Sequence, residues 1–214
     1  VLNTVFTAAV QWGVIDTKPC VVRLLKVPRT CASFHDFPAY ERLVDAARSL
    51  EVNAYLVVLL GGEAGLRCGE MLALQWQDVN LVTGQLTVER SEWKGHVTTT
   101  KGGRVRYVPL TTRLRLALQA QRHLRSHRVL AGKDGRPLTQ KMVQNLVKWA
   151  ARRAAVPHGV HILRHTFCSH LAMRGGSAPK IQILAGHQNL ATTQRYMHLT
   201  PATLEATIRL LEHP

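Results

Sequence analysis

The spacing of apolar residues predicts helices along the first third of the chain. Residues 2–14, LNTVFTAAVQWGV, carry apolar side chains at helical intervals and stop at Gly13. Residues 36–50 predict a second helix, with Asp36 as its cap and Pro38 in the first turn, where the missing N–H of proline is harmless. Residues 54–66 are apolar nearly all round and predict a core helix, after which helical spacing resumes over 67–76.

The pattern changes to a period of two in the middle of the chain. Residues 85–91, 96–101 and 104–110 alternate in this way, so we expect three antiparallel strands, with a tight hairpin turn at Gly102 and Gly103 between the last two. Helical spacing then returns in six segments, namely 112–130, 139–155, 161–174, 178–185, 192–198 and 201–211. The predicted fold class is therefore α+β, a mainly helical domain with a small three-stranded antiparallel sheet.

Glycine, capping and linker residues between these segments predict where the helices end and where the domains meet. Gly175 and Gly186 stand where helix C-caps are expected, and Thr192 is the expected cap of a short helix that carries Tyr196. The extended stretch after the first helix contains proline and lysine and indicates a linker. We therefore expect residues 1–32 to be the end of a preceding domain plus a linker, and residues 33–214 to be one domain.

Charge narrows the choice of partner. The chain has 28 Lys and Arg against 13 Asp and Glu, a formal net charge of +15, and 11 histidines. A polyanion such as nucleic acid is the natural partner. The longest apolar run, residues 54–62, is too short to span a bilayer, and the start lacks a basic signal-peptide region, so we expect a cytoplasmic protein without a membrane partner. The four cysteines are too scattered for a zinc site or a disulfide framework.

Two helical segments carry candidate chemistry. Arg67 and Glu70 lie three residues apart and share a helix face, so the carboxylate can orient the guanidinium, although a weak surface pair has the same spacing. His161 and Arg164 likewise share a face, which is either a cationic site or a solvated edge.

The segment TTTKGGRVR and the chain around Tyr196 are the other candidates. If Gly102 and Gly103 form a two-residue loop, Lys101 opposes Arg104 with Arg106 on the same face, and an anion between them would relieve the repulsion. The alternative is a wet hairpin tip whose charges point apart. Taken alone, Tyr196 is most simply a buried tyrosine with its hydroxyl satisfied.

Taken in order, these residues resemble the signature of the tyrosine recombinase, or phage integrase, family. AGLRCGEMLALQW resembles its first box, HILRHTF its His-x-x-Arg box, and GHQNLATTQRYMH its Gly-His and nucleophile box. The resemblance runs from about Ser33 to Leu211 and implies the catalytic domain of that family. Residues 1–14 resemble the last helix of the family's N-terminal core-binding domain.

The resemblance implies a site-specific recombinase that cleaves and rejoins DNA through a 3′-phosphotyrosine, without metal, ATP or another cofactor. The implied catalytic residues are Arg67, Lys101, His161, Arg164, His187 and Tyr196, with Glu70 in support. Arg67, Arg164 and His187 would hold the phosphate oxygens, Tyr196 would attack, and Lys101 would protonate the leaving oxygen.

Acidic residues are sparse, and no DxD or HExxH run appears, so arginines are expected to replace the metal. The remaining basic residues, including Arg104, Arg106, Lys141, Lys148, Arg152 and Arg153, are expected to follow the DNA backbone. Family members act as tetramers on paired double-stranded DNA sites, so we expect residues 201–211 to dock on a neighbouring subunit, although this chain alone can be monomeric. Three alternatives stay open: type IB topoisomerase, a DNA-binding regulator that has lost catalysis, and a metal-dependent nuclease.

Overall fold

The computed structural model describes residues 2–20, 33–100 and 103–199 of the 214 residues. It divides the chain into two compact units, Val1–Cys31 and Ala32–Pro214. The first unit carries α1 (Leu2–Gln11), which confirms the first predicted helix, and Gly13 follows with a φ of 68°. The predicted helix at 201–211, and Lys101 and Gly102 of the predicted hairpin, lie outside the described residues.

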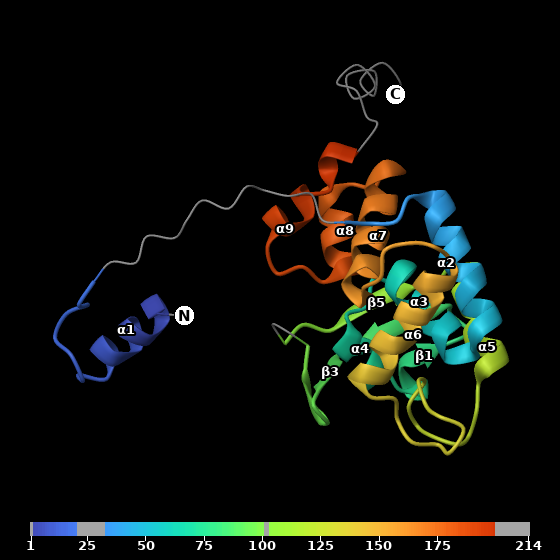
Figure 1. Cartoon of the computed structure of the whole chain (residues 1–214), viewed down its shortest axis with the longest axis horizontal. Coiled ribbons are helices and arrows are strands. Elements are labelled where there is room, and N and C mark those ends of the chain that lie inside the picture. The colour runs from blue at the N-terminus through green and yellow to red at the C-terminus, as the bar shows by residue number, and fades with distance from the viewer. Residues whose placement is uncertain (1, 21–32, 101–102, 200–214) are drawn as a thin grey trace. The chain divides into compact units, whose positions relative to one another are not determined.

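The second unit is mainly helical, as predicted (Figure 1). Its α-helices are α2 (Phe37–Leu50), α3 (Val52–Gly62), α4 (Cys68–Ala73), α5 (Thr112–Gln121), α6 (Gln140–Arg153), α7 (Val160–Met173), α8 (Ala178–Ala185) and α9 (Leu190–Gln194). Two 3₁₀ turns, η1 (Trp76–Asp78) and η2 (Met197–Leu199), follow α4 and α9. The predicted cap of α2 is confirmed, because the Asp36 carboxylate accepts a hydrogen bond from the backbone N–H of Ala39 at 2.8 Å.

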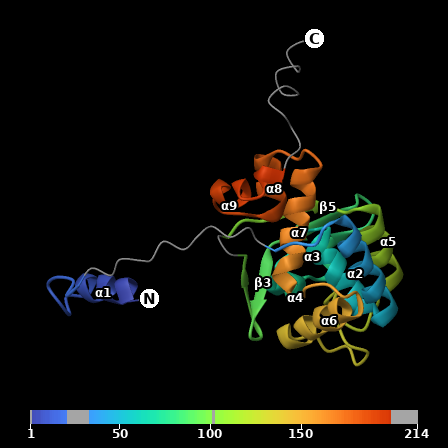
Figure 2. The same cartoon turned by 45° about the horizontal axis from the view of Figure 1, so that its top comes forward.

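Helix α3 is the centre of the main core, as its apolar sequence predicts. It packs against α2, α5, α6 and α7 (Figure 2). Its residues 56–60 are completely buried. Burying an aliphatic side chain of this size contributes roughly 1.5–3 kcal/mol. Helices α4 and α7, which carry Glu70 and Arg164, both pack against α3.

A second, smaller core lies between α7 and α8, which run beside each other with α9 next to them (Figures 1 and 2). Its buried members are Phe167, Cys168, Ala172, Ile181, Ala185 and Tyr196. Tyr196 is thus positioned by apolar packing against α7 and α8.

The strands form two small antiparallel sheets. One has the order β1 (Val79–Asn80), β2 (Gln85–Val88), β5 (Arg106–Pro109), and the other pairs β3 (Arg90–Trp93) with β4 (His96–Thr99). In the first sheet Leu86 is opposite Val108 and Val88 is opposite Arg106. Leu86, Val88 and Val108 point into the main core, which fixes the register because a slip by one residue would expose them.

The predicted segments do contain strands, but 85–91 is divided between β2 and β3, and the predicted pairing is wrong. The segment 96–101 does not form a hairpin with 104–110; β4 pairs instead with β3, through a two-residue turn at Lys94 and Gly95, and β5 pairs with β2. Both turn residues have positive φ, 49° and 83°, as the turns that match strand twist require. The N–H of Gly103 donates to the carbonyl of Thr100, three residues earlier, and not to a partner strand.

Three helix predictions also need correction. The short helix predicted at 192–198 to carry Tyr196 is α9, which ends at Gln194, so Tyr196 lies beyond it. The segment predicted as helical at 112–130 ends at Gln121, because Arg128 forms a β-bridge with Gln75 and its guanidinium donates to the carbonyl of Leu72. The cap of α9 is Asn189, whose side chain accepts from the N–H of Ala191, and not Thr192. Gly186 caps α8 with a φ of 68°, as predicted.

Candidate active site

Arg67 lies at the start of α4 and is held by Glu70. The backbone N–H of Arg67 donates to Glu70 Oε2 at 2.8 Å and its Nη1 donates to Glu70 Oε1 at 2.7 Å. The Glu70 side chain is 1% exposed, so the pairing predicted from the sequence is confirmed and the weak surface pair is excluded. The second guanidinium nitrogen of Arg67, Nη2, donates to the carbonyl of Gly186 at 3.0 Å.

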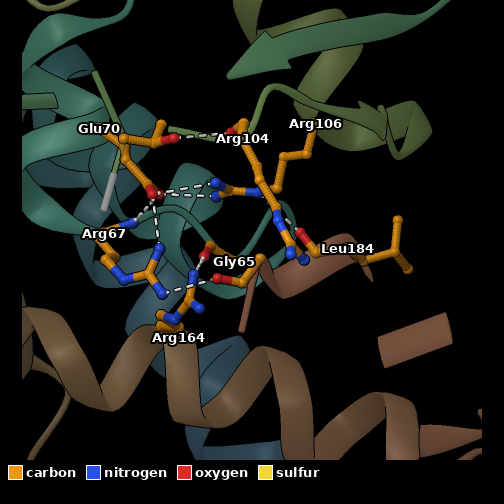
Figure 3. A network of polar contacts seen from close by, with 9 residues as sticks. Gly65, Arg67, Glu70, Arg104, Arg106, Arg164 and Leu184 are labelled. Carbon is orange, nitrogen blue, oxygen red and sulfur yellow. Dashed lines mark hydrogen bonds and ion pairs between the residues drawn. The ribbon is translucent and has the colours of Figure 1, made fainter. Parts of the chain in front are cut away.

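A second arginine, Arg106 on β5, approaches the same carboxylate from another side (Figure 3). Its Nη1 and Nη2 donate to the two oxygens of Glu70 at 3.0 and 2.7 Å, and its Nε donates to the carbonyl of Leu184 on α8. Burial alone would raise the pKa of Glu70, but the bonds and charges of Arg106 and Arg67 outweigh it and hold the pKa at about 2.

This arrangement changes the interpretation of Arg106. The sequence placed it among the cations that follow DNA, whereas the structure buries it, 7% exposed, with all of its guanidinium nitrogens engaged. Glu70 on α4 is therefore held by Arg67 and Arg106, and these two arginines also bond the carbonyls of Gly186 and Leu184 at the end of α8. Arg104, two residues earlier, is exposed, and its carbonyl accepts from the hydroxyl of Thr100.

Arg164 on α7 is the most buried of these arginines, at 4% exposed. Its Nη1 donates to the carbonyl of Gly65 at 2.5 Å, while its buried Nη2 has no hydrogen-bond partner among the described residues. Burial and the nearby Arg67 lower the pKa of Arg164 to about 10, so it stays charged at neutral pH. Gly65 has a φ of 64°, and a Cβ there would lie 2.5 Å from the Phe167 ring, so only glycine fits this contact.

His187 follows the Gly186 cap and faces the same group of cations. Its Nδ1 is 2.9 Å from the hydroxyl of Thr193, and its ring stacks nearly parallel to that of Tyr196, with centroids 6.3 Å apart. Burial, then the charges of Arg164 and Arg67, lower the pKa of His187 to about 4. The imidazole is therefore neutral at pH 7.

Tyr196 is 5% exposed, and its hydroxyl lies 2.5 Å from Nδ1 of His165. Burial raises the pKa of Tyr196 to about 12, although Arg164 acts in the opposite direction. His165, half-buried on α7, has its pKa lowered by burial and by the neighbouring His161 and Arg164. The phenol is thus neutral and partnered by a neutral imidazole, as in the simplest reading of a buried tyrosine.

A pocket of about 250 Å³ opens in front of this network. Its walls include Arg67, Arg104, Arg106, Gly186 and His187. Arg67, Arg104, Arg106 and the neutral His187 therefore line one hollow. Arg164 is near enough to Arg67 and Arg106 for their charges to lower its pKa, and its Nη2 has no hydrogen-bond partner among the described residues. Such an array is suited to bind an anion that offers several oxygens.

The other predicted residues lie elsewhere or outside the described part of the chain. His161 is exposed at the start of α7 and lines a separate hollow with Lys141 and Lys148 of α6. Arg152 and Arg153 are exposed at the end of α6. In the described ranges no three His, Cys, Asp or Glu side chains gather as metal ligands, and no helix is long and apolar enough to cross a membrane.

Sequence reasoning missed His165 and the clamping role of Arg106. Arg106 carried a signal, since an arginine inside an alternating strand points either to solvent or to a buried acid, but the choice depends on strand pairing. His165 carried none, because its contact with Tyr196 joins residues 31 apart along the chain.

Comparison with known proteins gives a consistent result. Residues 35–203 match the Phage integrase family. The tyrosine recombinase XerC of Xanthomonas campestris pv. campestris (strain B100) is 34% identical over 199 residues, which cover 87% of this chain and 58% of that protein. The chain therefore spans little more than half the length of this relative.

Solved structures show the same fold. The integrase of the transposon Tn1549, in complex with a circular intermediate DNA, aligns with a TM-score of 0.79 at 20% identity, over 98% of this chain and 75% of that one. A lambda integrase dimer bound to a COC′ core site aligns with a TM-score of 0.68 at 21% identity, over 89% and 70%.

Proposed function

This chain belongs to the phage integrase family, and from that membership we propose that it is the catalytic part of a site-specific DNA recombinase. The proposed reaction cleaves and rejoins double-stranded DNA through a 3′-phosphotyrosine on Tyr196. The proposal is supported by the XerC relative, a tyrosine recombinase, and by the DNA bound in the Tn1549 integrase structure.

The observation that carries this function is the guanidinium of Arg164. It is buried and fixed through Nη1 to Gly65, yet Nη2 lacks a hydrogen-bond partner among the described residues. A buried charged donor without a partner is costly in a folded protein, so it needs an arriving acceptor. A phosphodiester supplies two non-bridging oxygens, one for Arg164 and one for Arg67, which is prealigned by Glu70.

In the proposed mechanism, Tyr196 Oη attacks phosphorus, the Oη–P bond forms, and the bond from phosphorus to the 5′ oxygen breaks. Arg67 and Arg164 stabilise the charge on the non-bridging oxygens. His187 is neutral; with its Nδ1 accepting from Thr193, Nε2–H becomes a third donor. Lys101 protonates the departing 5′ oxygen, and His161 assists orientation or proton transfer.

The covalent link conserves the energy of the phosphodiester. The 5′ hydroxyl of a partner strand can therefore reverse the step without ATP or a metal. We propose that Arg104, Lys141, Lys148, Arg152 and Arg153 contact the DNA backbone, since all five are exposed cations. Such contacts contribute affinity and salt dependence but little sequence selection.

The larger assembly is also a proposal. Residues 1–32 would be the end of a core-binding domain and its linker. We propose that full-length subunits form a tetramer on paired sites, with residues 201–211 docking on a neighbour, and that the protein acts in the cytoplasm at the nucleoid. The dimer in the lambda integrase structure supports assembly of subunits on DNA.

A covalent trap tests the reaction. Nicked duplexes with a randomised core are incubated with the protein in EDTA, and adducts that survive SDS are isolated and sequenced to identify a substrate. We expect an adduct with the wild type and with Tyr107→Phe, a control at an exposed tyrosine, and none with Tyr196→Phe. An adduct with Tyr196→Phe would contradict the assigned nucleophile.

The trap, together with cleavage, relaxation and strand-exchange assays, separates the alternatives. DNA binding without any adduct from the wild type would indicate a non-catalytic regulator. Cleavage lost on adding EDTA would indicate a metal-dependent nuclease. Relaxation of supercoils without exchange of strands between two duplexes would indicate a topoisomerase.

A further inference from the structure

The hydroxyl of Tyr196 has a specific basic partner. His165 Nδ1 lies 2.5 Å from it, and the two rings are tilted by 37° with centroids 6.0 Å apart. Both residues are held in place: Tyr196 packs in the small core between α7 and α8, and His165 lies within α7, one residue after the phosphate-binding candidate Arg164. The contact is therefore held by α7, the same helix that carries Arg164, and by the small core that packs Tyr196.

The chemistry of the pair assigns the direction of the hydrogen bond. A phenol is a stronger acid than the N–H of a neutral imidazole, so the hydroxyl of Tyr196 donates and Nδ1 of His165 accepts. The tautomer of His165 then carries its proton on Nε2. Nδ1 is thus a free base at hydrogen-bond distance from the proton that must leave, which is the geometric requirement for a general base.

The other histidines are less suited to this role. His187 stacks on the Tyr196 ring, but its Nδ1 is engaged with Thr193. His161 is exposed one helical turn before His165 and lines a different hollow. Since residues four apart share a helix face, His161 is placed to exchange a proton between His165 and solvent.

We propose that His165 is the residue that positions Tyr196 and accepts its proton during DNA cleavage. The proton passes from Oη to Nδ1 as the Oη–P bond forms, and the 5′ oxygen leaves with a proton from a separate acid. In the rejoining step the bond from Oη to phosphorus breaks, and the phenolate takes its proton back from His165. The inference rests on the proposed function, because it assigns a role within the same reaction.

The need for such a base follows from the burial of Tyr196. With a pKa of about 12, only about one phenol in 10⁵ is ionised at pH 7. Nearby cations alone do not correct this, because burial outweighs Arg164 in setting the pKa. An adjacent imidazole removes the proton during the attack, so no free phenolate has to accumulate.

Variants of His165 test the proposal on the DNA duplex recovered by the trap, at single turnover. His165→Gln retains a side chain that can hydrogen-bond the phenol but cannot accept its proton. We expect adduct formation at pH 7 to slow by about 10²–10³-fold, the usual contribution of a general base. His170→Gln, which removes another half-buried imidazole from the same helix, is expected to remain within about 3-fold of wild type.

The pH profile distinguishes a base from a structural contact. The groups facing His165 are His161 and Arg164 on α7, His187 after α8, and Tyr196 after α9. The wild-type rate should level off at neutral pH, because the pKa of His165 lies below 6.5 and the imidazole is then already neutral. The rate of His165→Gln should instead keep rising about tenfold per pH unit up to pH 9. A flat profile parallel to wild type would overturn the proposal.

A modified substrate separates the base from the acid. A 5′-bridging phosphorothiolate has a leaving group that needs no proton, so it should restore Lys101→Ala but leave His165→Gln slow. Restoration of His165→Gln would show that this histidine acts on the leaving group, and the proposal would be wrong. If the wild type forms no adduct, the proposed function itself fails. If it does and His165→Gln cleaves at the wild-type rate, only this inference fails.

Discussion

Replacing Glu70 with glutamine tests the network that orients the site. The fall in the pKa of Glu70 from 4.5 to about 2, at about 1.36 kcal/mol per pH unit, corresponds to about 3 kcal/mol in favour of the folded state at pH 7. Glutamine keeps the volume but removes the charge that both arginines share. It leaves Arg106 buried without a counter-ion, and breaking a buried pair in this way costs about 3–5 kcal/mol.

The sign of the pH dependence follows from the lowered pKa. The charge of Glu70 contributes its full stability above about pH 4.5, and this contribution is lost as the pH falls towards 2. The difference in free energy of unfolding between wild type and Glu70→Gln should therefore be about 3 kcal/mol at pH 7 and less than half of that at pH 3.

Urea unfolding followed by circular dichroism measures both values. The control is Asp45→Asn, which breaks an exposed pair with Arg48 whose side chains are 65% and 66% exposed; we expect a change within about 0.5 kcal/mol at either pH. If Glu70→Gln cost no more than this control, or if its cost were the same at pH 3 as at pH 7, the network would not be held by the charge of Glu70.

Three further predictions concern the site and the DNA surface. Arg164→Gln should lower the rate of adduct formation by at least about 10²-fold while gel-shift affinity changes only a few fold, since in the proposed mechanism the lost donor acts on the reacting phosphate. Gly186→Ala should destabilise the protein by about 1–2 kcal/mol more than Gly175→Ala in urea unfolding; both have positive φ, but only at Gly186 does a new Cβ meet side-chain atoms, at 3.0 Å. Lys148→Ala and Arg152→Ala should each reduce the slope of log affinity against log salt by about 1, with little change in sequence preference.

The helices were largely predictable because each is specified by local signals. The cap at Asp36, the apolar sequence of α3 and the stop at Gly186 were confirmed in the structure. The segment after Gln121 was not predictable in this way, because its conformation is fixed by distant partners: Arg128 is tied to the carbonyl of Leu72. Tertiary contacts override helical spacing where the side chains have such bonds to make.

The sheets show a different limit of prediction from sequence, which concerns strand pairing. A period of two identifies strands but not their partners, and the Gly102–Gly103 pair favoured a local hairpin. The segment 85–91, predicted as one strand, is in fact divided between β2, which pairs with β5, and β3, which pairs with β4. The turn between β3 and β4 uses Lys94 at a φ of 49°, a conformation in which lysine is uncommon, so the residues at this turn do not predict it.

The two histidines of HILRHTF show the same difference between what local spacing predicts and what tertiary contacts determine. Helical spacing groups His161 with Arg164, and family resemblance favours the same pair, whereas the structure places His165 at the phenol and leaves His161 exposed. Adjacent helical residues point about 100° apart, so Arg164 and His165 reach different partners, Gly65 and Tyr196. In the proposed mechanism, one turn of α7 thus presents the phosphate-binding Arg164 to one side and the general base His165 to the other. No spacing rule connects residue 165 to residue 196, because the contact depends on α8 folding back against α7 and burying Tyr196 in the core that they share.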